Sequence, residues 1–162
     1  MTDILHKVSQ KLHENNLSLV SAESCTGGWV AKILTDLEGS SSVFDRGFVT
    51  YSNQSKQDML GVSSHALDSF GAVSEQVAIE MAEGALENSQ ADIALSITGI
   101  AGPGGGSVEK PVGMVCFGWK QTSHKVVSST IYFDGDRDSV RAQAVDFALK
   151  GVIELIGEVK NS

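Results

Sequence analysis

The sequence predicts an α/β fold, a three-layer α/β/α sandwich with a central mixed β-sheet, built as one domain over residues 1–162. Segments with apolar side chains at helical spacing alternate along the chain with short strand-like runs rich in Val, Ile and Leu. Two more strand-like runs then follow each other across a turn, so the sheet mixes parallel and antiparallel strands. The length of 162 residues and the 41% hydrophobic content suit a single domain of ordinary size.

The first sixty residues predict three helices and two strands. An amphipathic stripe near the N-terminus is followed by a short, buried-looking strand and by a second helix that starts after a glycine pair. A second strand and a short helix complete this half, and glycines follow the second and third helices as stop signals. The expected bounds are 3–15, 29–37 and 54–60 for the helices and 17–22 and 43–51 for the strands.

The second half predicts two helices and three strands. Ser74 is a favoured N-cap, and Glu75 in the first turn complements the dipole of the helix that follows. A buried strand then runs into a glycine-rich loop, and two strands joined by a turn near residues 122–123 form a hairpin. A long helix ends the chain. The strands are expected over 93–97, 112–119 and 125–133, and the last helix from position 138.

Composition excludes several classes of protein. The net charge of −8 and the isoelectric point of about 4.8 disfavour a nucleic-acid-binding surface, although local donors can still hold a small anion. No apolar run approaches the roughly 20 residues of a membrane-spanning helix, and the first residues lack a signal-peptide pattern. We therefore expect a cytoplasmic protein without nucleic-acid or membrane partners. Cys25 and Cys116 are expected to stay unpaired, and the scattered histidines predict no metal site.

The segment AESCTGG, residues 22–28, joins the first strand to the second helix. Ligands of α/β proteins collect at the carboxyl ends of strands, and a helix N-terminus there offers free N–H groups to a phosphate or an oxyanion. Gly27 and Gly28 let the backbone approach a ligand. Ser24 is the candidate nucleophile of this segment. The alternative is that Ser24 or Thr26 only caps the helix.

A glycine-rich loop at residues 98–107 follows another predicted strand, with Lys110 close behind. It matches neither the dinucleotide-binding fingerprint nor the P-loop pattern. Glycines with nearby hydroxyl groups and a lysine nevertheless suit a backbone cradle for phosphate. The alternative is a flexible surface loop. Two such loops after two strands favour a shared cleft.

A third strand end carries Tyr51 and Lys56. A serine hydroxyl needs a base to become a nucleophile, and no histidine lies near a strand end. Lys56 can serve if burial or neighbouring cations lower its pKa, and Tyr51 can donate or relay a proton. The alternative for Lys56 is an ordinary solvated lysine. Cys25 is a rival nucleophile, but without an evident histidine partner it is less favoured than Ser24.

An acidic segment, residues 134–138, precedes the last helix. Its alternating aspartates resemble a calcium loop, but the glutamate at the twelfth loop position is missing. We interpret it as a turn and helix cap, followed by one functional arginine, Arg137 or Arg141, directed at a phosphate or carboxylate. Surface salt bridges are the alternative for both arginines.

Five blocks stand out along the chain: AESCTGG (22–28), GFVTYSN (47–53), GAVS (71–74), TGIAGP (98–103) and KPVG (110–113). Together they resemble a known family, the C-terminal domain of the competence/damage-inducible protein CinA. They occur in the order found in that family and extend the resemblance over nearly the whole chain. The lack of room for the additional N-terminal domain of full-length CinA suggests a stand-alone enzyme.

The resemblance implies hydrolysis of nicotinamide mononucleotide (NMN) to nicotinate mononucleotide and ammonia, in pyridine nucleotide salvage, without metal or cofactor. It implies Ser24 as nucleophile, Lys56 as base and Tyr51 as an assisting residue, in a homodimer. Two alternatives remain open: a non-catalytic nucleotide-binding module, and a metal-dependent nucleotide pyrophosphatase that uses segment 134–138. The candidate substrate-binding residues are Glu23, Cys25, Thr26, Gly27, Gly28, Thr98, Gly99, Gly102, Lys110, Arg137 and Arg141.

Overall fold

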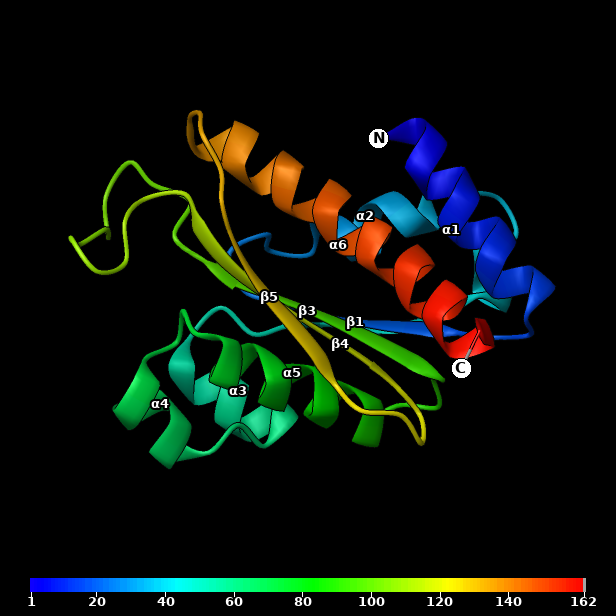
Figure 1. The fold of residues 1–162 in the computed structure, drawn as a ribbon, viewed down its shortest axis with the longest axis horizontal. Coiled ribbons are helices and arrows are strands. Elements are labelled where there is room, and N and C mark those ends of the chain that lie inside the picture. Colours follow the sequence, from blue (N-terminus) through cyan, green and yellow to red (C-terminus); the bar gives the residue numbers. More distant parts are fainter. Residues whose placement is uncertain (162) are drawn as a thin grey trace.

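One five-stranded mixed sheet lies at the centre of the computed structural model, which describes residues 1–161 (Figure 1). Its strands are β1 (Leu19–Glu23), β2 (Phe44–Val49), β3 (Ile93–Gly99), β4 (Met114–Gln121) and β5 (Val127–Tyr132). They lie in the order β2-β1-β3-β4-β5. β1 pairs in parallel with β2 and β3, whereas β4 pairs antiparallel with β3 and β5. The predicted mixed sheet and hairpin are therefore confirmed.

Helices cover both faces of this sheet, which confirms the predicted three-layer α/β/α sandwich. No helix among residues 1–161 combines the length and apolar character needed to cross a membrane. One face carries α1 (Thr2–Glu14), α2 (Trp29–Thr35) and α6 (Arg137–Asn161) (Figure 1). The opposite side carries α3 (Asn53–Leu60), α4 (Ser64–Phe70) and α5 (Glu75–Glu87), and a short 3-10 helix (Ser40–Ser42) precedes β2.

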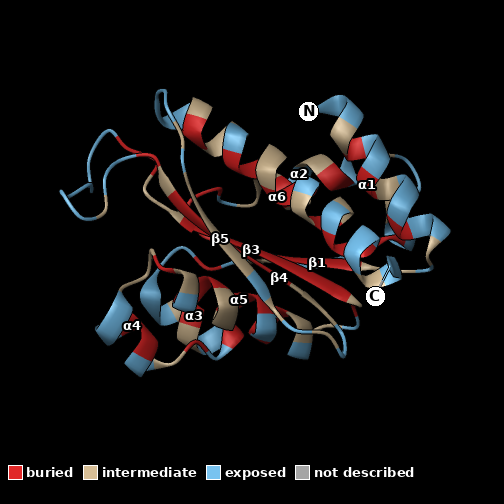
Figure 2. Cartoon of the chain, in the orientation of Figure 1, coloured by how far each residue is buried: buried red, intermediate tan, exposed pale blue. Residues whose placement is uncertain are grey.

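Buried residues concentrate in the sheet and on the helices that cover it (Figure 2). They form two apolar cores, and the alternation of side chains along each strand decides which core a residue enters. In β1, Leu19 faces the core beneath α1, α2 and α6, whereas Val20 and Ala22 face the core beneath α5. The first core holds the larger side chains, including Phe117 and Trp119, whose rings stack with centroids 5.6 Å apart. The odd-numbered residues of β1 therefore point toward the layer that contains α2 and α6.

Glycines allow α5 to lie against the backbones of its neighbours. A Cβ atom on Gly118 of β4 would lie 2.6 Å from the backbone oxygen of Ala78. A Cβ atom on Gly84 of α5 would lie 1.8 Å from the backbone oxygen of Leu60. These close contacts fix α3, which ends at Leu60, relative to the sheet.

Local capping signals place several helix ends. Ser74 caps α5 by accepting a hydrogen bond from the N–H of Val77, and Gly61 ends α3 in the left-handed region with φ of 67°. Both ends agree with the sequence prediction. Helix α4 was not predicted, because Ala66 and Leu67 are its only buried residues and they form no helical stripe.

The carboxyl ends of β1, β2 and β3 lie at one edge of the sheet because these strands run in parallel. Hydrogen bonds continue past the ends of the strands. The N–H of Ser24 donates to the oxygen of Ile97 at 2.9 Å, and the N–H of Thr50 donates to the oxygen of Glu23 at 2.8 Å. The segments that leave this edge therefore start from fixed positions.

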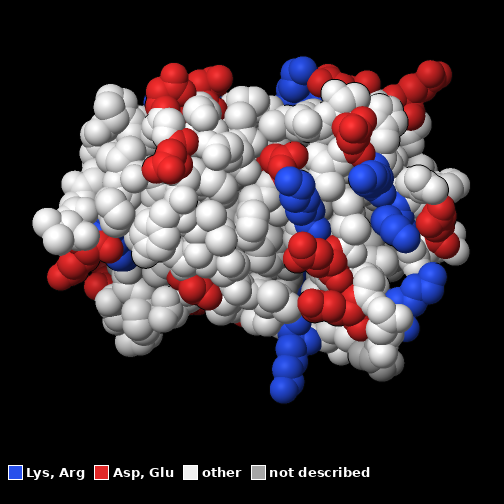
Figure 3. All heavy atoms as spheres, turned by 45° about the horizontal axis from the view of Figure 1, so that its top comes forward, with Lys and Arg blue, Asp and Glu red and all other residues white. Residues whose placement is uncertain are grey.

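Charged side chains are dispersed over the surface. On the face shown in Figure 3, acidic and basic groups are mixed and form no continuous basic area. Lys32 of α2 pairs with Asp36 at the C-cap of that helix, and Lys150 pairs with Asp146 within α6. Exposed pairs of this kind contribute little to stability.

Candidate active site

A lysine amine and a serine hydroxyl meet at the carboxyl edge of the sheet. Ser24 directly follows β1, and Lys56 lies on α3, whose N-terminus is capped by Ser52. The Nζ atom of Lys56 donates to Oγ of Ser24 at 3.0 Å and to the backbone oxygen of Thr50 at 2.9 Å. Lys56 is 1% exposed and Ser24 is 8% exposed. The predicted nucleophile and base thus lie within hydrogen-bond distance of each other.

Burial changes the proton affinity of this lysine. Desolvation penalises the charged form and lowers the pKa of the Lys56 amine from its ordinary value, while the nearby Cys25 acts in the opposite direction. A lowered pKa favours the neutral amine, which is the form that can accept a proton from Ser24. The burial also excludes the alternative that Lys56 is a solvated surface lysine.

The neighbouring thiol is the less reactive of the two candidate nucleophiles. Cys25 is buried, and this burial raises the pKa of its thiol to about 11. A thiol with this pKa stays protonated at neutral pH and is a poor nucleophile. The preference for Ser24 over Cys25 therefore has a physical basis.

A cavity of about 280 Å³ opens beside the Ser24–Lys56 pair. The three strand-end segments converge on it, as the sequence predicted. It contains eight of the residues predicted for catalysis or substrate binding: Ser24, Cys25, Tyr51, Lys56, Thr98, Gly99, Gly102 and Arg137. Four more lining residues, Ile100, Ala101, Gly104 and Gly105, belong to the loop predicted as a phosphate cradle, whereas Asn53, Ala72 and Val73 had no predicted role.

The unassigned residues Asn53, Ala72 and Val73 lie within the blocks that carry the family resemblance, so these blocks were the available signal. Their side chains show no catalytic chemistry that residue type alone could reveal. These residues line the cavity only because distant segments of the chain come together, and the sequence does not show which segments do so.

Arg137, the first residue of α6, brings a positive charge to the rim of this cavity. Its guanidinium donates to the backbone oxygen of Gly102 at 2.8 Å and to the hydroxyl of Tyr51 at 3.1 Å. Arg137 and Lys56 are the cationic side chains among the described residues that line the cavity. The arrangement can bind an anionic group near the glycine loop.

Glu23 lies beneath the nucleophile and not in the cavity wall. Its carboxylate is fully buried and accepts hydrogen bonds from Oγ1 of Thr26 at 2.7 Å and from the N–H groups of Val30 at 2.9 Å and Ala31 at 3.2 Å. The expectation that the N-terminus of α2 offers free N–H groups to a ligand is therefore wrong for these two donors. An internal carboxylate already caps this helix.

Arg141 supports the same turn from α6. Its Nε donates to the oxygen of Cys25 at 3.0 Å, its NH2 group donates to the oxygen of Thr26 at 3.2 Å, and its guanidinium lies 5.5 Å from the ring centroid of Trp29. Gly27 and Gly28 complete the turn with φ of 59° and 101°, a backbone conformation that favours glycine. Thr26, Gly27, Gly28 and Arg141 line a separate hollow beside α2, so the structure does not bring them into the Ser24 cavity.

Lys110 also lies outside the cavity. Its amine donates to the backbone oxygen of Phe70 at the end of α4, and it borders a neighbouring hollow with Glu75 and Thr130. The loop between β3 and β4 is thereby attached to α4. The sequence placed Lys110 near the glycine loop correctly but could not show where its side chain points.

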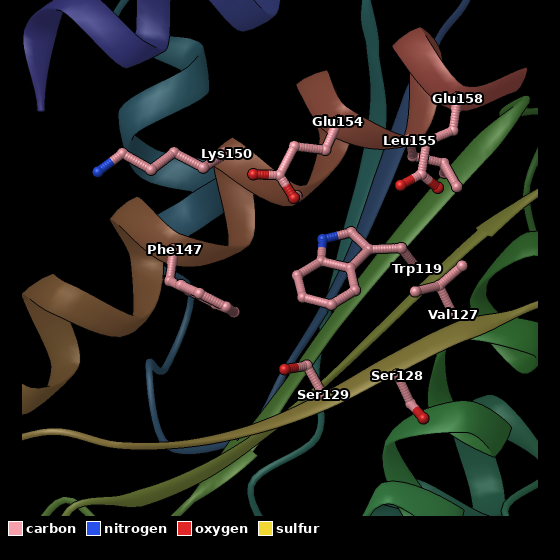
Figure 4. Close-up of a pocket in the computed structure, with 10 residues that line it drawn as sticks. Trp119, Val127, Ser128, Ser129, Phe147, Lys150, Glu154, Leu155 and Glu158 are labelled. Carbon is pink, nitrogen blue, oxygen red and sulfur yellow. The ribbon is translucent and has the colours of Figure 1, made fainter. Parts of the chain in front are cut away.

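The acidic segment 134–138 and the arrangement of possible metal ligands bear on the metal-dependent pyrophosphatase alternative. In the acidic segment, Asp136 accepts from the N–H of Ser139 and so caps the start of α6, as interpreted from the sequence. Among residues 1–161 no group of three or more His, Cys, Asp or Glu side chains is arranged to hold a metal ion. A further hollow lies between α6 and β5, with Trp119 on its floor and Phe147 and Glu154 along its rim (Figure 4), and it shares no residue with the Ser24 cavity.

The fold and site define a class of protein: a three-layer α/β/α domain with a buried serine–lysine hydrogen bond at the carboxyl edge of its sheet. The model of the CinA C-terminal domain family matches residues 1–156, and the chain belongs to this family.

Comparisons with individual proteins agree with this membership. Nicotinamide-nucleotide amidohydrolase PncC of Escherichia coli K12 is 51% identical over 150 residues, covering 93% of this chain and 91% of that protein. PncC of Enterobacter agglomerans is 57% identical over 129 residues, covering 80% and 79%. The crystal structure of the competence/damage inducible protein CihA from Agrobacterium tumefaciens superposes with a TM-score of 0.92 at 47% identity, covering 94% and 93%.

Proposed function

We propose that this chain is an amidohydrolase that converts NMN and water to nicotinate mononucleotide and ammonia, with Ser24 as nucleophile and Lys56 as base. The observation that carries the mechanism is the 3.0 Å contact between Lys56 Nζ and Ser24 Oγ at a buried position. The substrate is supported by relatives named nicotinamide-nucleotide amidohydrolase at 51% and 57% identity. We propose that this reaction serves pyridine nucleotide salvage.

The first half of the reaction acylates Ser24. The neutral form of Lys56, which burial favours by lowering the pKa of the amine, takes the hydroxyl proton while Oγ attacks the carboxamide carbon. Backbone N–H groups of the turn after Ser24 hold the oxyanion, and such a donor is worth about 10²- to 10³-fold in kcat. Protonated Lys56 then passes its proton to the leaving nitrogen, and ammonia departs.

The second half releases the acid. Water attacks the nicotinoyl ester of Ser24, Lys56 accepts the proton of that water, and the serine oxygen takes the proton back as the ester bond breaks. Tyr51 assists at the cavity rim, where its hydroxyl is held by Arg137 and can relay protons to solvent. No metal or cofactor enters these steps.

The guanidinium of Arg137 determines which way NMN lies in the cavity. Because Glu23 occupies N–H groups at the start of α2, the 5′-phosphate is held on the other side of the cavity by Arg137 and the loop around Gly102. The carboxamide then faces Ser24. Thr98 and Gly99 lie between the two ends, and Lys110 contributes by anchoring the loop to α4.

One experiment separates this function from its alternatives. Purified protein is incubated with NMN and a metal chelator, and ammonia and NMN binding are measured. Ammonia release without metal supports the amidohydrolase. Binding without release indicates a nucleotide-binding module, and phosphoanhydride cleavage of a dinucleotide only after metal is added indicates a pyrophosphatase.

A second experiment tests the nucleophile. Rapid acid quench during turnover, followed by mass spectrometry of peptides, is expected to find the nicotinoyl group on Ser24. Ser24→Ala should remove both the adduct and the activity while the protein stays folded. An adduct on Cys25, or full activity of Ser24→Ala, would contradict the assignment.

The family resemblance extends the proposal to the whole molecule. We propose one catalytic domain over residues 1–162 that acts in the cytoplasm as a homodimer. Light scattering of the purified protein measures the oligomeric state directly, and a mass equal to one chain of 17.1 kDa would refute the homodimer.

A further inference from the structure

We propose that Arg141 is a positioning residue that aims two backbone N–H groups, those of Cys25 and Thr26, at the oxyanion of the reaction. This inference rests on the proposed hydrolysis of an amide by Ser24. It assigns Arg141 a role different from substrate binding, because Arg141 lines the hollow on the other side of the turn and not the Ser24 cavity.

Two successive peptide units of the turn have their carbonyl oxygens tied by the protein. The oxygen of Ser24 accepts from the N–H of Gly27 at 3.0 Å, and the oxygen of Cys25 accepts from Nε of Arg141 at 3.0 Å. In a trans peptide unit the N–H points opposite to the C=O. The N–H groups of Cys25 and Thr26 are therefore directed away from these two contacts.

No other residue that the structure describes holds these two N–H groups. Within residues 1–161 neither the N–H of Cys25 nor that of Thr26 donates a hydrogen bond to another residue. They immediately follow the nucleophile in the chain, where donors to the developing negative charge are needed. Two adjacent donors with fixed directions form a ready anion-binding pair.

The contacts around Thr26 and Arg141 hold this arrangement firmly. Arg141 also donates to the oxygen of Thr26 at 3.2 Å and lies over the ring of Trp29. The buried carboxylate of Glu23 in turn accepts from the Thr26 hydroxyl at 2.7 Å. Arg141 thus holds the peptide unit that carries the Thr26 N–H directly. It also holds the Thr26–Gly27 unit, whose N–H binds the Ser24 oxygen and so fixes the unit that carries the Cys25 N–H; loss of Arg141 releases both.

A positioning role and a substrate-binding role predict different kinetics. Donors that act on the oxyanion stabilise the transition state more than bound substrate, so their misalignment lowers kcat and leaves KM nearly unchanged. A guanidinium that binds the phosphate instead raises KM for NMN and has no effect on nicotinamide riboside, which lacks the phosphate.

The test compares Arg141→Ala, Arg141→Lys and the control Lys32→Ala on both substrates. Lys32 lines the same hollow but pairs with Asp36 and contacts neither carbonyl of the turn. We expect Arg141→Ala to lower kcat about 100-fold for NMN and for any riboside turnover, with KM changed less than about threefold. Arg141→Lys, which can still reach one carbonyl, should recover part of this loss, and Lys32→Ala should match the wild type.

A substrate analogue with an aldehyde in place of the carboxamide gives a second readout. Ser24 Oγ adds to the aldehyde carbon, its proton passes to Lys56, and the carbonyl oxygen becomes an oxyanion without a leaving group. Arg141→Ala should weaken binding of the aldehyde nucleotide about 100-fold while product affinity stays unchanged. If Arg141→Ala does not fold, the same comparison is made with Arg141→Lys.

Failure of the positioning role and failure of the proposed function give different results in these experiments. Unchanged kcat in a folded Arg141→Ala protein, or an effect confined to KM for NMN, overturns the positioning role. Equal weakening of aldehyde and product overturns it as well. Absence of ammonia release by the wild-type protein overturns instead the proposed function on which the inference rests.

Discussion

Replacement of Lys56 by methionine removes the proposed base while keeping an unbranched side chain of similar length. The lysine amine is 1% exposed and lies 3.0 Å from Oγ of Ser24. The other ionisable side chains that line the cavity are Cys25, Tyr51 and Arg137. The Cys25 thiol has a pKa of about 11, and the Tyr51 hydroxyl is engaged by Arg137, so none of them replaces the amine.

The expected loss of kcat follows from the lack of another base among the described residues that line the cavity. A positioned general base contributes about 10²- to 10⁴-fold, so we expect Lys56→Met to lower kcat about 10³-fold, equivalent to about 4 kcal/mol. KM for NMN should change little, because the amine contacts Ser24 and the Thr50 carbonyl on the protein side of the cavity.

The assay is ammonia release from NMN as a function of pH. Because burial lowers the pKa of Lys56, wild-type kcat/KM should rise with pH below the ordinary lysine value of 10.5, as the amine loses its proton. This rising limb should disappear in Lys56→Met. Lys56→Arg, which stays charged, should also be inactive. A Lys56→Met protein that keeps the limb, or that keeps activity within about tenfold of wild type, would refute the base assignment.

The same lysine predicts a pH effect on stability. Between its lowered native pKa and 10.5, the unfolded state binds more protons at position 56 than the folded state does. Stability therefore rises with pH through this window. Urea denaturation at several pH values should show wild type gaining on Lys56→Met as pH increases, whereas a constant difference would contradict the lowered pKa.

Three more predictions concern support, substrate and packing. Glu23→Ala should lower the free energy of unfolding by about 3 kcal/mol in urea denaturation, because three buried donors lose their acceptor, and Glu23→Gln should lose less. Arg137→Ala should raise KM for NMN about tenfold or more without changing KM for nicotinamide riboside; an equal change for both would remove the phosphate contact. Gly84→Ala should destabilise the protein by about 3 kcal/mol or more, because the added Cβ meets the backbone of Leu60. Gly157→Ala on α6 has open space around it and should stabilise the protein by up to about 1 kcal/mol. Similar melting temperatures for the two variants would contradict this packing.

The layered fold could be predicted from the sequence because helix and strand periodicity is a local property. The stripe on α5 and its Ser74 cap are local signals, and the structure has both. The order of the strands is different, because β1 lies between β2 and β3 through contacts distant in sequence. Helix α4 escaped prediction for a related reason: its seven residues bury too few side chains to show a period.

The site could be predicted only as far as backbone direction determines it. Parallel strands bring their carboxyl ends together, so Ser24, Lys56 and Gly102 could be expected around one cleft. Which of the predicted site residues face this cleft depends on the direction of each side chain, which the sequence does not show. Glu23 is an odd-numbered residue of β1, so its side chain points toward α2. Arg141 lies four residues after Arg137 on α6, but it binds the turn after Ser24, whereas Arg137 binds Gly102.

The packing of Arg141 over Trp29 gives this chain a local optical reporter. The sequence has two tryptophans, and they sample different parts of the molecule. Trp119 is buried, and its indole N–H donates to the oxygen of Ala148, so its fluorescence follows global unfolding. Trp29 begins α2 beside the nucleophile turn, so its emission should respond when the guanidinium above it moves. A Trp119→Phe protein would leave Trp29 as a single probe of the turn, readable during turnover and independent of ammonia detection.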